Sequence, residues 1–343
     1  MDSKTKHIPL QFSNLFDKAK ETSFSGHMIF KKGNQTLFEA CLGEQNHDKD
    51  LKNTTNTYFF IASGTKFLTA LAIGRLIDEG KFTLRSYARD ILDLHLGYDQ
   101  HITIEQLLSH TSGMPDYLDE NEPDCGENIQ NSCLLTTNDY LSYFEAKPMV
   151  FQPGSSFRYN NGAYVYLALI IEALTKMSYQ DYVNDVLLKP LDIGKCGIYR
   201  TNLDDQDVAI GYLDKAKTPF YHAIPIMGGG DGGARMNATG LLKIFEAFYA
   251  GEIISPSLKE AFTKPYACIN RKLGICYGLG LWLYKKNNTY IPYLEGGDAG
   301  ISFKAVYDEK SKIFAYLASN TTMGVWSIID VFDKIVYKHL MCE

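Results

Sequence analysis

The sequence predicts an α/β (α+β) fold in which one antiparallel sheet is built from both ends of the chain. Three observations support this prediction. Alternating apolar runs occur between residues 26 and 42, strand patterns return after about residue 275, and the region between them is mostly helical. Because helices and sheets bury their apolar faces against one another, we expect a sheet flanked by helices, with an all-helical domain inserted into the chain.

The N-terminal part contains a hairpin between two helices. An amphipathic stretch covers 10–20, and the alternating runs 26–32 and 36–42 flank the turn signal Gly33-Asn34. Residues 62–79 then repeat apolar side chains at helical spacing, and Gly80 is a typical helix end.

The middle of the chain is helical and the last part returns to strands. Thr103 and Gln106 form a capping box, residues 162–176 have one apolar face, and Ser178 caps a helix that must end before Pro190. Strands are expected at 277–284, 289–294, 301–307 and 313–319, followed by an amphipathic helix at 325–340. The length of 343 residues suggests two domains, which we place at 1–85 with 205–343 (sheet) and at 86–204 (helical).

Composition and charge exclude several classes of function. Hydrophobic residues make up 45% of the chain and the net charge is −6, without a basic cluster that could bind phosphate groups. No apolar stretch reaches the length of a membrane span, and the first residues lack the apolar core of a secretory signal. We therefore expect a small-molecule or short-peptide partner, no nucleic acid and no membrane. The oligomeric state stays open.

The cysteines suggest a reducing compartment. There are seven, an odd number, and none forms a C-x-x-C pair. We expect reduced thiols in a cytoplasmic protein, and neither a disulfide framework nor a zinc site.

The first candidate for chemistry is Ser63, with Lys66 three residues later at a helix start. This spacing puts both side chains on one face, where a desolvated lysine amine can take the proton of a serine hydroxyl. The helix N-terminus adds positive potential where an oxyanion would form. Taken alone, the pattern is more typical of an ordinary helix start, and Ser3 with Lys6 also matches it.

The second candidate is Tyr159-Asn160-Asn161, which precedes a helix. A phenol can move a proton, and an amide two residues away can hold a substrate carbonyl or orient the lysine. The alternative is a turn tyrosine followed by a helix cap. Tyr182 with Asn184 has the same spacing, but Tyr182 lies on an apolar helix face and is expected in the core.

The third candidate is the segment 107–117, Leu-Leu-Ser-His-Thr-Ser-Gly-Met-Pro-Asp-Tyr. Gly113 and Pro115 are typical of a helix end. His110 has no acidic residue at orienting distance in the sequence, and we interpret it as a hydrogen-bonding loop residue rather than a base.

In combination, these motifs resemble a known family. Ser63-x-x-Lys66, Leu-Leu-Ser-His-Thr-Ser-Gly-Met-Pro, Gln-Pro-Gly…Tyr-Asn-Asn-Gly, Tyr277-Gly-Leu-Gly and a later Gly-Gly turn occur in that order. The order is similar to that of the serine β-lactamase and penicillin-binding-protein superfamily, and most similar to its class C-like branch of esterases, D-amino-acid peptidases and DD-carboxypeptidases. The resemblance covers nearly the whole chain from about Gly26, and it implies a β-lactamase/transpeptidase-like fold with the site between sheet and helical domain.

The resemblance also implies roles for individual residues. Ser63 matches the acylated nucleophile, Lys66 its proton acceptor, Tyr159 the general base or acid, and Asn161 a substrate-facing amide. The family's oxyanion hole pairs the nucleophile's N–H with one from a strand, here near Asp298. The reaction would be acyl transfer through an acyl-enzyme, without metal or cofactor.

The third motif departs from the family pattern. Where the family has Lys or His, a small residue and Gly, this chain has Glu295-Gly296-Gly297 before Asp298. A carboxylate there repels a substrate carboxylate, and it raises the phenol pKa and keeps the lysine protonated more readily. We expect a substrate with a neutral or cationic end and weak or absent β-lactamase activity. Glu295 could instead point away from the cleft or pair with a nearby cation.

Two hypotheses follow for the function. The first is a serine hydrolase acting on an ester or amide, such as an esterase, a D-amino-acid peptidase or a penicillin-binding-protein-like enzyme. The alternative is a non-turnover penicillin-binding or ligand-capturing protein of the same fold, which an impaired proton relay at Glu295 would favour. A G-x-G-x-x-G match at 228–233 is interpreted as a flexible loop lining the cleft, because no second βαβ unit follows it.

Overall fold

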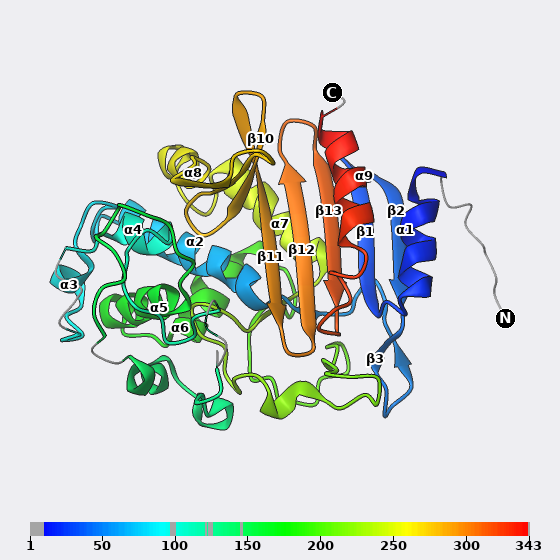
Figure 1. The fold of residues 1–343 in the computed structure, drawn as a ribbon, viewed down its shortest axis with the longest axis horizontal. Coiled ribbons are helices and arrows are strands. Elements are labelled where there is room, and N and C mark those ends of the chain that lie inside the picture. Colours follow the sequence, from blue (N-terminus) through cyan, green and yellow to red (C-terminus); the bar gives the residue numbers. More distant parts are fainter. Residues whose placement is uncertain (1–9, 97–100, 121, 123–125, 145–146, 342–343) are drawn as a thin grey trace.

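A computed structural model describes residues 10–96, 101–120, 122, 126–144 and 147–341. Its main feature is an eight-stranded antiparallel sheet in the order β2-β1-β13-β12-β11-β10-β9-β8 (Figure 1). In that order the strands are β2 (Gln35–Leu42), β1 (Gly26–Lys32), β13 (Ile313–Ser319), β12 (Ile301–Asp308), β11 (Thr289–Asp298), β10 (Trp282–Lys286), β9 (Ile275–Tyr277) and β8 (Ala267–Asn270). The N-terminal hairpin pairs with the last strand, so the sheet is built from both ends of the chain, as predicted.

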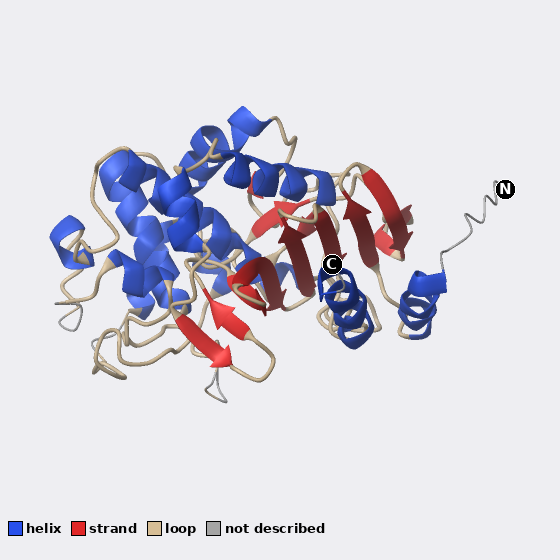
Figure 2. Ribbon diagram, turned by 90° about the horizontal axis from the view of Figure 1, so that it is seen from above, coloured by secondary structure: helices blue, strands red, loops and turns tan. Residues whose placement is uncertain are grey.

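Helices cover both faces of this sheet. On one face lie the N- and C-terminal helices α1 (Leu10–Glu21) and α9 (Ile329–Met341), which bury an aromatic cluster around Phe12, Phe30 and Phe332 (Figure 2). The other face belongs to a larger core that continues into the helical half of the molecule. The remaining α-helices of the described residues are α2 (Thr65–Asp78), α3 (Ala88–Ile91), α4 (Ile104–Leu108), α5 (Asn161–Thr175), α6 (Tyr179–Asp181), α7 (Ala238–Ala250) and α8 (Pro256–Phe262), and a π-helix, Tyr182–Leu188, continues α6.

The predicted helix signals are found in the structure. Thr103 and Gln106 form a complete capping box at the start of α4, and Ser178 caps α6 through the N–H of Asp181. Tyr182 is buried in the helical core, as expected. Among the described residues, no helix is long and apolar enough to cross a membrane.

Two expectations about the C-terminal part are wrong. Residues 277–284 do not form one strand, because β9 ends at Tyr277 and a tight turn closed by the Gly278 N–H to the Leu281 carbonyl leads into β10. In that turn, Gly280 has φ +79° and packs against the Lys66 carbonyl, so the break brings the sheet against α2.

The prediction that all cysteines are reduced is also wrong. Cys268 and Cys276 form a disulfide, because the register of β8 and β9 places these two residues directly opposite each other. The sequence pattern could not show this, since the pairing depends on the hairpin register. Cys125 and Cys342 lie outside the described residues.

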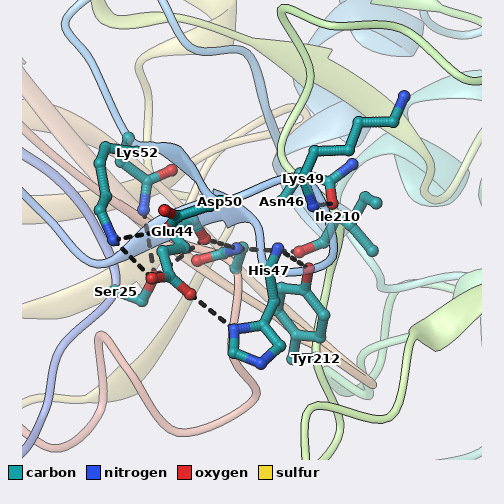
Figure 3. Close-up of polar contacts among 11 residues, drawn as sticks. Ser25, Glu44, Asn46, His47, Lys49, Asp50, Lys52, Ile210 and Tyr212 are labelled. Carbon is teal, nitrogen blue, oxygen red and sulfur yellow. Dashed lines mark hydrogen bonds and ion pairs between the residues drawn. The ribbon is translucent and has the colours of Figure 1, made fainter.

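Two small sheets complete the fold. The strand β5 (Phe59–Phe60) pairs with β7 (Ala234–Met236), which also pairs with β6 (Gly197–Ile198). The hairpin of β3 (Glu44–Asn46) and β4 (Leu51–Lys52) is held by a polar network (Figure 3). In it, Glu44 contacts both Lys52 and His47, which lower the pKa of Glu44 to about 2, and the His47 N–H donates to the Tyr212 hydroxyl at 2.6 Å. This network ties the hairpin to the loop before Tyr212.

Candidate active site

The predicted nucleophile lies at a strained junction between strand and helix. Ser63 is the central residue of a single 3₁₀ turn, Ala62–Gly64, between β5 and α2. The preceding residue, Ala62, is buried and has a φ of +42°, a left-handed conformation that costs a non-glycine residue free energy. The strain indicates that the surrounding structure, rather than local preference, fixes the direction of the Ser63 side chain.

Strand β11 passes directly against this turn. A Cβ atom at Gly296 would lie 2.7 Å from the Ser63 nitrogen and even closer to the Ile61 carbonyl oxygen. Only glycine therefore fits at this position of the third motif. The close approach places the end of β11 beside the Ser63 backbone, where the resemblance expects an oxyanion hole. The second N–H donor, near Asp298, stays a prediction.

Lys66 is buried and reaches Ser63. Its side chain is 1% exposed, and its Nζ lies 2.9 Å from Ser63 Oγ, 2.8 Å from Asn161 Oδ1 and 2.9 Å from the Asp231 carbonyl oxygen. All three acceptors are uncharged oxygens. Burial lowers the pKa of Lys66 below its ordinary value, and the more distant carboxylates, first that of Asp231, offset this only in part. A lysine with this pKa shift can accept a proton from the serine.

The amide of Asn161 is fixed by the N-terminus of α5. The two oxygens of Asp116 accept the backbone N–H groups of Asn161 and Gly162, at 2.6 and 2.7 Å, and the Asn160 side chain caps the N–H of Ala163. The Asn161 amide nitrogen donates to the Leu118 carbonyl, so the amide oxygen must face Lys66. Asn161 therefore orients the lysine in this structure.

Tyr159 lies between two aromatic side chains. The ring of Trp282 stacks on it at 6.1 Å with an interplanar angle of 8°, and the His110 ring centroid lies 4.2 Å away. Lys66 Nζ is 4.8 Å from the centre of the Tyr159 ring. Burial raises the pKa of Tyr159 well above 10, and its hydrogen bond with Ser63 opposes that shift only in part. Tyr159 therefore keeps its proton at neutral pH.

His110 supports Tyr159 and is not positioned as a base. Its Nδ1 accepts the Asn160 N–H at 3.0 Å, so its Nε2 carries the proton and donates to the Tyr277 hydroxyl at 3.1 Å. Burial, together with the charge of Lys66, lowers the pKa of His110 well below 6.5. The neutral ring agrees with its interpretation as a hydrogen-bonding loop residue.

Glu295 lines a cavity together with Ser63 and also pairs with a cation. The register of β11 and β12 places Glu295 opposite Lys304, whose Nζ is 3.7 Å from Glu295 Oε2 and 3.1 Å from Asp333 Oδ2 on α9. The Glu295 side chain is 30% exposed. Burial raises the pKa of Glu295, and Lys304 opposes this shift. Glu295 therefore lines the cavity next to Ser63 while it is paired with Lys304.

Two cavities flank the 3₁₀ turn. The first, here called the Ser63 cavity, has a volume of about 370 Å³. It is lined by Ser63, Glu120, Tyr159, Trp282, Glu295, Gly296, Gly297 and Trp326. The second has a volume of about 230 Å³, is lined in part by Ala62, Tyr117 and Asp298, and also includes residues of the 228–233 loop. That loop lines a cavity, as its interpretation as a cleft loop requires.

The structure thus brings together the predicted residues Ser63, Lys66, Tyr159, Asn161, Glu295 and Gly297, while Asp298 lines the neighbouring cavity. Sequence reasoning missed other residues at the site. Lys304 could have been found by counting residues in both directions from the turn after Asp298, because the antiparallel register then places Lys304 opposite Glu295. Trp326 gave no signal, since it comes from the loop before α9.

The comparisons with known proteins agree with this geometry. Residues 23–326 match the family described as Beta-lactamase. Penicillin-binding protein 4* of Bacillus subtilis (strain 168) is 28% identical over 345 aligned residues, covering 92% of this chain and 72% of that protein. The crystal structure of a penicillin-binding protein from Bacillus halodurans superimposes with a TM-score of 0.85 at 27% identity, covering 94% of this chain and 99% of that one.

Other relatives are longer or more distant. Protein flp of Staphylococcus aureus (strain MW2) is 34% identical over 200 residues, covering 56% of this chain and only 38% of that protein. The chain therefore spans about four tenths of that relative's length. A D-stereospecific amidohydrolase from Streptomyces sp. shares the fold, with a TM-score of 0.77 at 19% identity over 98% of this chain and all of that one.

The chain belongs to the Beta-lactamase family, whose match covers most of its length. Its fold is that of the penicillin-binding-protein-like serine hydrolases, as the resemblance predicted.

Proposed function

We propose that this protein is a serine hydrolase that cleaves an ester or amide through an acyl-enzyme on Ser63. The observation that carries the proposal is the buried Lys66 amine, 2.9 Å from Ser63 Oγ and surrounded by uncharged acceptors. A neutral amine at this distance is a base in hydrogen-bond reach of the nucleophile.

The proposed reaction has two halves. In the first, Ser63 Oγ forms a bond to the substrate carbonyl carbon while its proton passes to Lys66 Nζ. The leaving group then departs with a proton supplied from Lys66 through the Tyr159 hydroxyl, which is protonated at neutral pH because its pKa is raised. In the second, a water molecule attacks the acyl carbon, gives one proton to Lys66, and Ser63 leaves with that proton.

The electrostatics of the site support a restricted range of substrates. Glu295 lines the Ser63 cavity where the family pattern has a cation. Substrates that present a carboxylate there, such as penicillins, are therefore expected to react slowly. Esters and amides of D-amino acids or other neutral and cationic acyl donors are the substrate classes we favour.

Labelling with a fluorophosphonate probe tests the nucleophile. Intact-protein mass spectrometry should show one adduct on the wild type and on Ser257→Ala, an exposed serine of α8, and none on Ser63→Ala. Equal labelling of Ser63→Ala would refute the proposal.

Turnover separates the two hypotheses about function. Continuous hydrolysis of p-nitrophenyl esters, lost in Ser63→Ala, supports the hydrolase. A single stoichiometric burst without further release would instead support the ligand-capturing alternative, in which Glu295 impairs the proton relay.

A further inference from the structure

The Ser63 cavity has an unusual lining for a site next to a nucleophile. It contains the carboxylates of Glu120 and Glu295 together with the aromatic rings of Tyr159, Trp282 and Trp326. None of the described residues that line it is a lysine, arginine or histidine. The two indoles are the only tryptophans of the whole chain. A cavity with this lining attracts positive charge and offers aromatic rings to it.

The charge behind the cavity does not cancel that of Glu295. Lys304 contacts Glu295 Oε2, but it lies closer to Asp333, at 3.1 Å against 3.7 Å. The formal charge of these three side chains is −1, and Glu120 adds a further carboxylate at the cavity wall. Lys304 itself is 4% exposed and does not line the cavity, so an incoming ligand meets the carboxylate first.

The indoles are placed where a ligand near Ser63 can contact them. Trp282 is fixed by stacking on Tyr159 and on Tyr293, each with a ring centroid 6.1 Å away. An edge contact with Tyr277, whose ring centroid is 4.9 Å away, holds it further. The Trp326 ring lies 3.4 Å from the Cβ position of Gly297, and the missing side chain leaves that indole uncovered toward β11. Both tryptophans are only partly buried.

We propose that the Ser63 cavity binds the ammonium group of the substrate, held by Glu295 and the rings of Trp282 and Trp326. This inference rests on the proposed hydrolase function and names its substrate class: esters or amides whose acyl part carries an organic cation a few atoms from the scissile carbonyl. Ring faces and carboxylates together favour an alkylated ammonium, because such an ion loses little hydration when it leaves water.

Binding can be measured without turnover. In Ser63→Ala, tryptophan fluorescence is titrated with 4-(trimethylammonio)butyramide and with its uncharged isostere 5,5-dimethylhexanamide. Because both tryptophans line this cavity, the signal reports its occupancy directly. The cationic amide should bind about tenfold more tightly or better, and Glu295→Gln in the same background should remove most of that preference. Glu260→Gln, at a surface carboxylate of α8 that pairs with Lys264, is the matched control and should keep the preference.

Two results would overturn the proposal: equal affinity for the two amides, or a preference for the cation that survives Glu295→Gln. Neither result depends on catalysis, so failure of this inference is distinct from failure of the proposed function, which is measured by Ser63-dependent ester hydrolysis. Replacing the trimethylammonium by a primary ammonium decides between alkylated and simple amines, since a cage of rings favours the former and a carboxylate alone the latter.

Discussion

The site contains two buried lysines that differ in almost everything except their burial. Lys66 and Lys304 are 1% and 4% exposed. Lys66 contacts uncharged oxygens, and burial lowers its pKa. Burial also acts to lower the pKa of Lys304, but Tyr284 and the carboxylates of Asp333 and Glu295 raise it above the ordinary value. Burial makes a lysine sensitive to its surroundings, but the charge of its direct partners decides the direction of the shift.

This difference assigns the two amines to different tasks. Lys66 can become neutral and exchange a proton with Ser63, which is 2.9 Å away. Lys304 stays a cation that holds Glu295 and joins α9 to the sheet. The experiments below test whether the two lysines behave as this contrast requires.

The largest effect is expected from removing the amine of Lys66. Lys66→Met keeps the length of the side chain but cannot accept a proton, so kcat/KM for an uncharged p-nitrophenyl ester should fall by roughly 10²- to 10⁴-fold. Lys66→Arg should be as inactive, because a guanidinium stays protonated. Lys312→Met, a surface lysine paired with Glu309, is the control. If Lys66→Met retained more than a tenth of the activity, Lys66 would be excluded as the main base.

The pH dependence should reflect the lowered pKa of Lys66. Below this pKa the amine is protonated, so kcat/KM for an uncharged ester should rise about tenfold per pH unit and then level off below pH 10.5, the ordinary lysine value. Tyr159 keeps its proton over this range, because its pKa is raised. A rate that does not change between pH 5 and 10 would contradict the assignment.

Stability should depend on pH in opposite directions for the two lysines. Between the lowered pKa of Lys66 and pH 10.5, the unfolded chain binds that proton more tightly, so the free energy of unfolding contributed by Lys66 rises with pH. Above pH 10.5 the folded chain holds the Lys304 proton more tightly, and that contribution is lost as the pH rises through the raised pKa. Urea unfolding of Lys66→Met and Lys304→Met over pH 6–11 separates the two contributions, because the difference from the wild type should change with pH below 10.5 for Lys66→Met and stay constant there for Lys304→Met.

Removing Lys304 should destabilise the fold. Lys304→Met leaves Glu295 and Asp333 without their shared cation, and fully enclosed pairs lose about 3–5 kcal/mol when broken this way. Since both carboxylates are partly exposed, roughly 2–3 kcal/mol is expected at neutral pH. Adding Glu295→Gln and Asp333→Asn to Lys304→Met should restore part of the lost stability. A loss below about 0.5 kcal/mol would show that water already screens the network.

The parts of the site that the sequence predicted are those set by local spacing. Ser63 and Lys66 are three residues apart on one helical turn, and Tyr159 and Asn161 adjoin the start of α5. By contrast, Lys304, Asp333 and Trp326 reach the site through strand register and the packing of α9, which no short pattern encodes. The same limit explains the missed disulfide between Cys268 and Cys276, whose pairing depends on the β8–β9 register.

The smallest effect is expected from reversing the charge at Glu295. Because Glu295 lines the Ser63 cavity, it repels the carboxylate of a penicillin by on the order of 1 kcal/mol at an effective dielectric near 20 and a separation beyond about 10 Å. Glu295→Lys places a second cation beside Lys304, so the total amount of folded protein must be measured first. In the folded variant, acylation by penicillin relative to an uncharged ester should rise about fivefold or more, since the ester feels no net Coulomb interaction and controls for damage to the site. If the penicillin-to-ester ratio did not change, Lys304 would already neutralise the charge of Glu295 at the distance of the substrate. The contrast between the two lysines would then concern stability alone.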